Sequence, residues 1–367
     1  MKWHYHTNNR YFKGKFDAID EYLKHKKALL LEVPDSYGSF DFTTEPKEDM
    51  QTLLKSEAVK VRERHDYIRL FYSGGADSHA VLDAFVNNGL HIDEIVCMKS
   101  GFQSADYEID QYAVPYLDSI RRKLEKTKIR ILKPTINDYD KWYNGNWTDQ
   151  YLEHRFASTV SFFRLIDQPY EFNDGALNIK AKDKPTMVSN QGKFYTYIAD
   201  SIFETEHYMY HFLLENPAIL SKQCHLLLKK FKNHPRELNR FFQSMDSQDT
   251  ANSIIHNQEA SLPLKQKHYL EGGCIQFRGK DLHYVNEKDR LALVEAVEQC
   301  PDIVEKWRAG VEDLRSSRFM HWFNGGRPEL GTIGILSRFY GLDEKTIKTV
   351  DQLYPSGFTQ QNIMDQA

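Results

Sequence analysis

Between residues 67 and 135, short apolar segments alternate with longer amphipathic ones, and this is the clearest pattern in the chain. Residues 67–72 are rich in β-branched and aromatic side chains, which predicts a strand that stops at a pair of glycines. The elements expected next are a helix over 77–87, a strand over 92–98, a helix over 105–126 that Pro115 kinks or splits, and a strand over 129–132. This alternation predicts an α/β fold with a parallel, doubly wound sheet covered on both faces.

The rest of the chain has weaker patterns. We expect an amphipathic helix over 17–27, a short buried strand over 28–33, and a hairpin whose strands flank residues 190–193. Beyond residue 200 the spacing of apolar residues is mainly helical. The predicted division is therefore an N-terminal extension (1–60), a nucleotide-binding domain (61–200) and a mainly helical C-terminal domain (201–367).

The glycine turn carries the most informative chemistry in the sequence. Its six residues are Ser73, Gly74, Gly75, Ala76, Asp77 and Ser78, placed between a predicted strand and a predicted helix. Glycine lets phosphate oxygens approach backbone N–H groups closely, and the following helix directs its partial positive charge at an anion. The serine hydroxyls add donors, and Asp77 is placed to cap the helix or to hold a metal ion.

This SGGxDS segment resembles the PP-loop of the ATP pyrophosphatases, which include asparagine synthetases, NAD synthetases and tRNA-lysidine synthetases. The Walker pattern GxxxxGK[ST] does not occur in the chain. The resemblance covers residues 73–78 and is supported by the expected context from 67 to 135. It implies a fold of the adenine nucleotide α-hydrolase (HUP) type. It also implies binding of ATP with Mg²⁺, transfer of AMP to a carbonyl or carboxylate oxygen, and release of pyrophosphate.

The same resemblance suggests roles for residues outside the loop. Adenine is expected near Met98, at the end of the second strand, and Asp77 is the candidate metal ligand. The leaving pyrophosphate needs cations, and Lys99 and Lys133, which end the second and third strands, are the candidates. Solvated surface side chains are the alternative reading for both lysines.

The positions of the cysteines help to indicate which branch of the ATP pyrophosphatases the chain resembles. Cys97, Cys224, Cys274 and Cys300 form no CxxC pair, which argues against sulfur transfer or a zinc ribbon. The chain begins Met1-Lys2-Trp3, without the catalytic cysteine of a glutamine-hydrolysing domain. A weaker similarity to phage-encoded proteins described as asparagine-synthase-like extends over 204–207, the aromatic-rich segment that follows, 219–232 and 337–340. The segment 337–340 is expected to face phosphate or to form a helical surface patch.

The charge and hydropathy of the chain do not decide between three classes of function. The net charge of −4 gives no general reason to expect nucleic acid. Two basic segments, 121–133 and 222–240, are expected either to contact nucleic-acid phosphates or to be solvated surface. We therefore expect an AMP-forming, amide-forming enzyme acting on a small molecule, with a nucleic-acid-modifying enzyme and a non-catalytic nucleotide-binding protein as alternatives. No run of eighteen apolar residues and no apolar signal core occurs, so we expect no membrane span and a cytoplasmic location (the host cytoplasm if the chain is phage-encoded).

Overall fold

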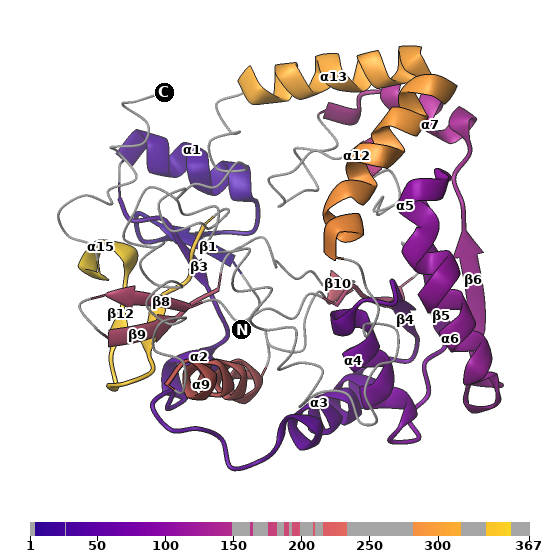
Figure 1. Ribbon diagram of the computed structural model, residues 1–367. Helices are drawn as coiled ribbons and strands as arrows, with labels where there is room; N and C mark the ends of the chain where they lie inside the picture. Colours follow the sequence, from indigo (N-terminus) through magenta and orange to yellow (C-terminus); the bar gives the residue numbers. More distant parts are fainter. Residues whose placement is uncertain are drawn as a thin grey trace.

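Two lobes make up the described part of the chain (Figure 1). The computed structural model describes residues 4–25, 27–148, 162–163, 175–181, 187–190, 193–198, 208–209, 216–232, 282–316 and 335–353. The parallel-sheet lobe consists of the described residues within 48–181, 208–209 and 282–316. The antiparallel lobe consists of those within 4–47, 187–198, 216–232 and 335–353.

Five parallel strands form the sheet of the first lobe, in the order β10-β7-β4-β5-β6. Their bounds are β4 Ile68–Phe71, β5 Glu94–Met98, β6 Lys128–Leu132, β7 Leu177–Ile179 and β10 Tyr208–Met209. The first three are the strands expected from the hydrophobic pattern. The parallel sheet with intervening helices confirms the α/β fold class.

Helices connect and cover these strands. They are α3 Met50–Arg64, α4 Ala76–Val86, α5 Gln103–Glu108, the π-helix η1 Ile109–Ala113, α6 Val114–Ser119, the 3₁₀ helix η2 Arg121–Leu124, α7 Ile136–Tyr143, α12 Leu282–Gln299 and α13 Pro301–Ser316. The helix expected over 105–126 is thus divided, as the position of Pro115 predicted. Proline has no N–H to donate, and here it lies in the first turn of α6, directly after the π-helical turn.

The two faces of the parallel sheet differ in polarity. Ile68, Leu70 and Ile95 belong to the larger hydrophobic core, together with Leu82 and Phe85 of α4. Because side chains alternate along a strand, the residues between them point to the opposite face. That opposite face carries a buried polar network.

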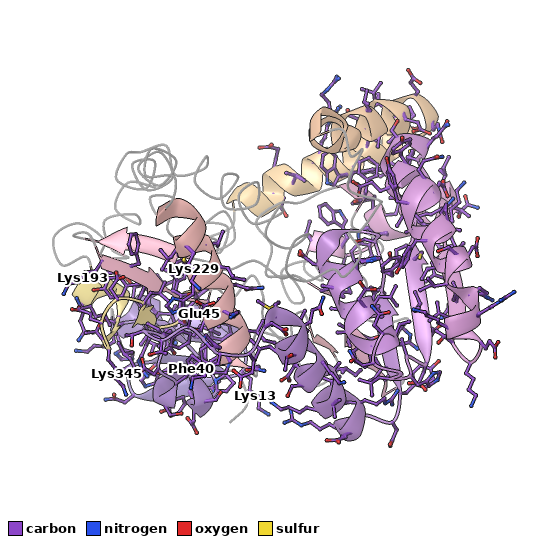
Figure 2. The ribbon with its side chains drawn as sticks, turned by 60° about the horizontal axis from the view of Figure 1, so that its bottom comes forward. Lys13, Phe40, Glu45, Lys193, Lys229 and Lys345 are labelled. Atoms are coloured by element: carbon purple, nitrogen blue, oxygen red, sulfur yellow. The ribbon has the colours of Figure 1, made fainter. Side chains whose placement is uncertain are left out.

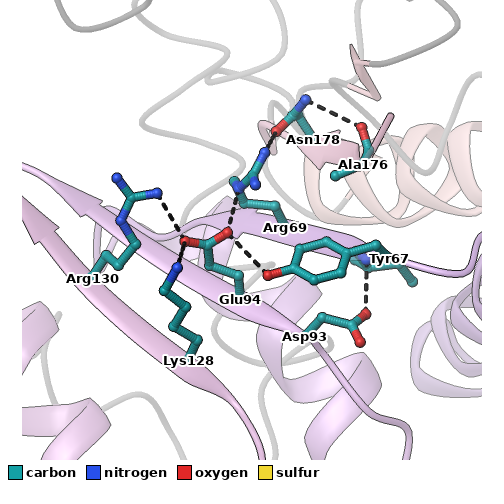
Figure 3. A network of polar contacts seen from close by, with 9 residues as sticks. Tyr67, Arg69, Asp93, Glu94, Lys128, Arg130, Ala176 and Asn178 are labelled. Atoms are coloured by element: carbon teal, nitrogen blue, oxygen red, sulfur yellow. Dashed lines mark hydrogen bonds and ion pairs between the residues drawn. The ribbon is translucent and has the colours of Figure 1, made fainter. Parts of the chain in front are cut away.

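Glu94 is the centre of this network (Figure 3). Its carboxylate accepts hydrogen bonds from Arg69 Nε on β4 at 2.6 Å and from Arg130 Nη1 on β6 at 3.1 Å, and Lys128 Nζ lies 3.7 Å away. Arg69 also donates to Asn178 Oδ1 on β7 at 2.9 Å. The network therefore joins four neighbouring strands. Its members Asn178, Arg69, Glu94 and Lys128 lie opposite one another, and Arg130 is two residues farther along β6. Burial alone would raise the pKa of the Glu94 carboxyl, but the hydrogen bonds from Arg69 and Arg130 hold that pKa below its usual value.

The antiparallel lobe contains two small sheets, ordered β2-β1-β3 and β12-β11-β9-β8. Its elements are β1 His4–Thr7, β2 Arg10–Phe12, α1 Lys15–His25, β3 Leu30–Glu32, α2 Asp35–Ser39, β8 Met187–Asn190, β9 Lys193–Thr196, α9 Pro217–Lys232, β11 Phe339–Gly341, β12 Ile347–Lys348 and α15 Val350–Leu353. The expected helix over 17–27, strand over 28–33 and hairpin around 190–193 correspond to α1, β3 and the β8–β9 pair.

One expectation for the C-terminal region is wrong. Residues 337–340 do not form a helical surface patch, because Phe339 and Tyr340 are buried in β11, which pairs with β9. The hydroxyl of the buried Ser337 accepts the N–H of Ile198 at 2.9 Å and donates to a backbone carbonyl at 2.8 Å. This serine serves the fold of the antiparallel lobe and lies in a different lobe from the glycine turn. Segment 204–207 lies outside the described residues.

The lobes meet where α9 packs against α3. Lys222 Nζ of α9 lies 2.8 Å from the carboxylate of Glu45, and Lys229 pairs with the same carboxylate. Glu45 and Lys229 are labelled in Figure 2, which is turned so that the bottom of Figure 1 comes forward. Two lysines of the second basic segment are therefore paired with a carboxylate of the same chain. Arg236 and Arg240 of that segment lie outside the described residues. The domain boundaries at 60 and 200 stay predictions. Strands that precede residue 200 pair with strands that follow it in two sheets, β7 with β10 and β9 with β11.

Candidate functional site

The order of the strands singles out the carboxyl end of β4. From β4 the chain proceeds to β5 and β6 on one side of the sheet, whereas β7 and β10 lie on its other side. Strand order therefore reverses at β4. In open α/β sheets, ligands bind outside the carboxyl ends of the strands at such a switch point. The loop of residues 73–78 begins two residues after the end of β4.

Gly74 has the most constrained backbone in this loop. Its φ is +72°, in the left-handed region that side chains disfavour. A Cβ atom at Gly74 would lie 3.1 Å from Cβ of Ala113 and 3.3 Å from the Ala113 backbone. The absence of a side chain at Gly74 thus lets the loop turn tightly against the π-helix η1.

Gly75 is different, because its backbone is ordinary. It is the N-cap of α4, with φ −71° and ψ 158°, and a Cβ there would meet only Ser73 Oγ, at 3.2 Å. No side chain caps this helix. The N–H groups of the first turn of an α-helix have no partner within the helix, and they carry its positive partial charge. The beginning of α4 is therefore suited to an anion.

Two serines hold the loop in shape. Ser73 N–H donates to Ser78 Oγ at 3.3 Å, the two hydroxyl oxygens lie 3.2 Å apart, and Ser78 Oγ donates to the carbonyl of Gly75 at 3.1 Å. Ser73 is exposed and Ser78 is buried. The Ser73 hydroxyl can therefore turn to a ligand, while Ser78 mainly fixes the turn. Asp77 lies in the first turn of α4 and is half-buried.

The end of β5 contributes Lys99 to the same edge. Its Nζ lies 2.5 Å from Asp110 Oδ1, and Asp110 belongs to η1, whose Ala113 contacts Gly74. Lys99 and the glycine turn are thus connected through one π-helical turn. The adjoining turn is fixed by the buried Asp106, which accepts from Ser100 N–H at 2.5 Å and from Gly101 N–H at 3.1 Å. Met98, the expected adenine contact, is half-buried at the end of β5.

The two other lysines at this edge differ in their distance from the loop. Lys133 follows β6, the outer strand of the sheet, and is exposed. Two strand spacings of about 4.8 Å each separate β6 from β4. Lys180 follows β7, which pairs directly with β4, and its Nζ lies 5.1 Å from the ring centre of Phe71. Lys99 and Lys180 therefore flank the loop on either side, whereas Lys133 lies farther away.

Lys180 was missed by the sequence reading. The same signal that singled out Lys99 and Lys133, a short apolar strand followed by lysine, occurs at Leu177-Asn178-Ile179-Lys180. Nothing local to this segment shows that its strand pairs with β4, more than a hundred residues earlier. Asp110 was missed for a similar reason, because its contact with Lys99 depends on the π-helical turn.

The buried His79, in α4, helps to order the loop. His79 Nδ1 and the hydroxyl of Tyr72 lie 2.9 Å apart, and His79 Nε2 lies 3.5 Å from Asp83 Oδ2. Burial lowers the pKa of His79 to about 4. His79 is therefore neutral at physiological pH, and it orders the junction of β4 and α4 without adding charge to the site.

Metal ligands at this edge are few. Among the described residues, no group of three or more His, Cys, Asp or Glu side chains is arranged to hold a metal ion. Magnesium in nucleotide sites is usually held by one or two carboxylates together with phosphate oxygens and water. A single carboxylate at Asp77 fits that mode of binding, whereas it does not fit a site built wholly from protein ligands.

Comparisons with protein-family models, with curated proteins and with solved structures find no match to this chain. Within the described ranges, no helix is both long and apolar enough to cross a lipid bilayer.

Proposed function

We propose that this chain binds ATP with Mg²⁺ at the loop of residues 73–78 and transfers AMP to a carbonyl or carboxylate oxygen of an acceptor, releasing pyrophosphate. The observation that carries the proposal is an uncapped helix N-terminus, preceded by a left-handed glycine, at the switch point of a parallel sheet. The PP-loop resemblance of Ser73–Ser78 supports the same reading. It also motivates assignment to the adenine nucleotide α-hydrolase type and to asparagine-synthase-like, phage-encoded enzymes of the cytoplasm.

Each part of the nucleotide has a candidate partner. The first-turn N–H groups of α4 and the Ser73 hydroxyl would bind the β- and γ-phosphates, and Gly75 allows their close approach. Lys99 and Lys180 flank the loop and would neutralise negative charge on the leaving pyrophosphate. Asp77 would hold Mg²⁺ together with the phosphates, and Mg²⁺ would supply further charge neutralisation. Met98 would contact adenine.

The proposed reaction class is the one that the PP-loop resemblance implies. An oxygen of the acceptor attacks the α-phosphorus, and the bond to the oxygen that bridges the α- and β-phosphates breaks. Pyrophosphate leaves with that electron pair. Ammonia or an amine then attacks the activated carbon, loses a proton, and displaces AMP. Among the described residues, Lys99 and Lys180 are the cations placed to stabilise the first leaving group.

Thermal unfolding with Mg²⁺ and ATP, compared with GTP and with no nucleotide, tests the binding step. A ligand at about 100 times its dissociation constant stabilises the native state by about 2.7 kcal/mol. We expect a shift with ATP and none with GTP. Gly75→Val is the matched variant, because the backbone of Gly75 suits any residue. It should keep the melting temperature without nucleotide and lose the shift with ATP.

Pyrophosphate release across a panel of carboxylates and amines separates an enzyme from a nucleotide-binding protein without turnover. Formation of AMP and pyrophosphate in equal amounts supports the proposed reaction. Release of ADP and phosphate would contradict cleavage between the α- and β-phosphates. If ATP binds and no acceptor in a broad panel leads to AMP, the non-catalytic alternative is favoured.

A further inference from the structure

A hollow of about 500 Å³ lies at the opposite, amino-terminal edge of the parallel sheet. Its walls come from the end of α4, the turn before β5, and the segment 122–127 before β6. Val86, Leu90 and Leu124 supply apolar surface, and His91, Arg122, Lys123 and Lys126 supply the basic groups. The proposed ATP site does not involve any of these residues.

The cations at this hollow are available to a ligand. Arg122, Lys123 and Lys126 are exposed, as is the neighbouring Arg121. Among the described residues, Arg121, Arg122 and Lys126 contact no carboxylate, and Lys123 contacts only the neutral side-chain amide of Asn87, at 3.3 Å. Lys128 and Arg130, from the same basic segment, are instead engaged with Glu94. The first basic segment thus divides into a structural half and a half that faces solvent.

Negative charge near the hollow is limited. Glu125 is the one acidic side chain among the residues that line it. Asp93, nearby, lies 2.6 Å from Arg62 and 3.4 Å from His91. The last carbonyls of α4 accept N–H groups from Asn87, Asn88 and Leu90, which offset the negative end of that helix.

We propose that this basic hollow, defined as residues 86–92 and 121–127, binds the phosphate backbone of a single-stranded nucleic acid. The exposed cations extend past the hollow along one short segment, which suits a chain of phosphates better than a single phosphate group. No Phe, Tyr or Trp side chain lines the hollow, and the one imidazole there, His91, lies 3.4 Å from Asp93. Binding should therefore depend on salt and not on base sequence, because base stacking adds little here.

The test uses a fluorescently labelled oligouridylate of about 20 nucleotides, with the matching oligothymidylate as a second probe. Binding is measured by anisotropy over a series of salt concentrations. Each phosphate contact contributes about 0.7 to the slope of log affinity against log salt for a single strand. The double variant Arg122→Gln/Lys126→Gln should bind more weakly at low salt, with a slope shallower by about 1.4. Both probes should respond alike.

Two controls make the result specific to the hollow. Lys13→Gln/Lys345→Gln removes the same charge from exposed positions of the antiparallel lobe (Figure 2) and should leave binding unchanged. Gly75→Val should also bind the oligomer as the wild type does, so this inference stands or fails separately from the ATP site. Equal melting temperatures of the variants verify folding. The inference is overturned if the wild type does not retain either strand at low salt. It is also overturned if Arg122→Gln/Lys126→Gln matches the control pair.

Discussion

The sheets of the two lobes differ in how far apart in the sequence their paired segments lie. In the parallel-sheet lobe, β4, β5 and β6 follow one another within 65 residues, and helical segments connect them. In the antiparallel lobe, residues near the two ends of the described chain meet, as in the hydrogen bond from Leu31 N–H to the carbonyl of Leu336, at 2.9 Å. Local crossovers leave a periodic pattern in the sequence, and remote pairings do not.

Their ion pairs differ as well. Glu94 is 1% exposed and has cations on two neighbouring strands. In the antiparallel lobe, the side chains of Lys193 and Glu344 are 48% and 34% exposed. Water screens the second pair and is excluded from the first. The comparison predicts that substitutions of similar chemistry will have unequal effects in the two lobes.

Glu94→Gln should have the largest effect on stability. It leaves Arg69 buried beside a neutral amide, and breaking a buried pair in this way typically costs about 3–5 kcal/mol. Glu344→Gln, the matched change in the antiparallel lobe, should cost less than about 1 kcal/mol. Denaturant unfolding followed by circular dichroism measures both. Equal losses of unfolding free energy would show that burial does not make the pair of Glu94 with Arg69 more important than that of Glu344 with Lys193.

The protonation of His79 should contribute to the pH dependence of the free energy of unfolding. Its pKa falls from 6.5 to about 4 on folding, so the unfolded chain binds the proton more tightly. The stabilisation is complete above pH 6.5 and is lost as the pH falls towards 4, by at most about 3 kcal/mol. His79→Gln should flatten this part of the profile, measured as the denaturant midpoint against pH. An unchanged slope between pH 6.5 and 4 in the variant would assign the dependence to other groups.

Gly74→Ala should destabilise the parallel-sheet lobe by about 1–3 kcal/mol, because it forces a side chain into the left-handed region and against Ala113. Gly75→Ala, one residue later, should change stability by less than about 0.5 kcal/mol, since its backbone is ordinary. Thermal unfolding of the two variants compares the glycines directly. Similar losses would show that the constraint is shared by both positions.

Ser337→Ala tests the antiparallel lobe at a remote contact. The variant leaves the N–H of Ile198 without its partner in a buried position, which costs about 1–3 kcal/mol. Ser337→Thr keeps the hydroxyl and serves as the control. Denaturant midpoints should fall for alanine and recover in part for threonine. No loss with alanine would mean that another group or water satisfies Ile198.

Asp110→Asn should change the affinity for ATP and not the stability of the fold. Asp110 holds Lys99 and adds negative charge beside the proposed phosphate site. Removing that charge should raise the affinity for ATP by about fivefold, which corresponds to about 1 kcal/mol. Titration with Mg²⁺ and ATP measures the change. A weaker affinity would indicate that Asp110 positions Lys99 for the phosphates.

The sequence by itself determined the elements from β4 to β6, the tight glycine turn, and the β8–β9 hairpin. Each depends on side-chain periodicity, or on glycine and proline, within a few tens of residues. Pro115 likewise indicated a break in the helix. It did not indicate the π-helical turn that brings Asp110 to Lys99, because that contact needs the packed arrangement of η1 against the loop.

Only the tertiary structure decided the strand order, the polar face of the parallel sheet, and the position of Lys180. The contacts behind them join distant residues, such as Arg69 with Asn178, which are 109 positions apart, and Ile198 with Ser337, which are 139 apart. A strand of three residues, such as β7 or β11, has too little pattern of its own to specify its partner. Burial and hydrogen bonding of the whole chain select that partner, and this selection places Lys180 beside the glycine turn and Ser337 in the other lobe.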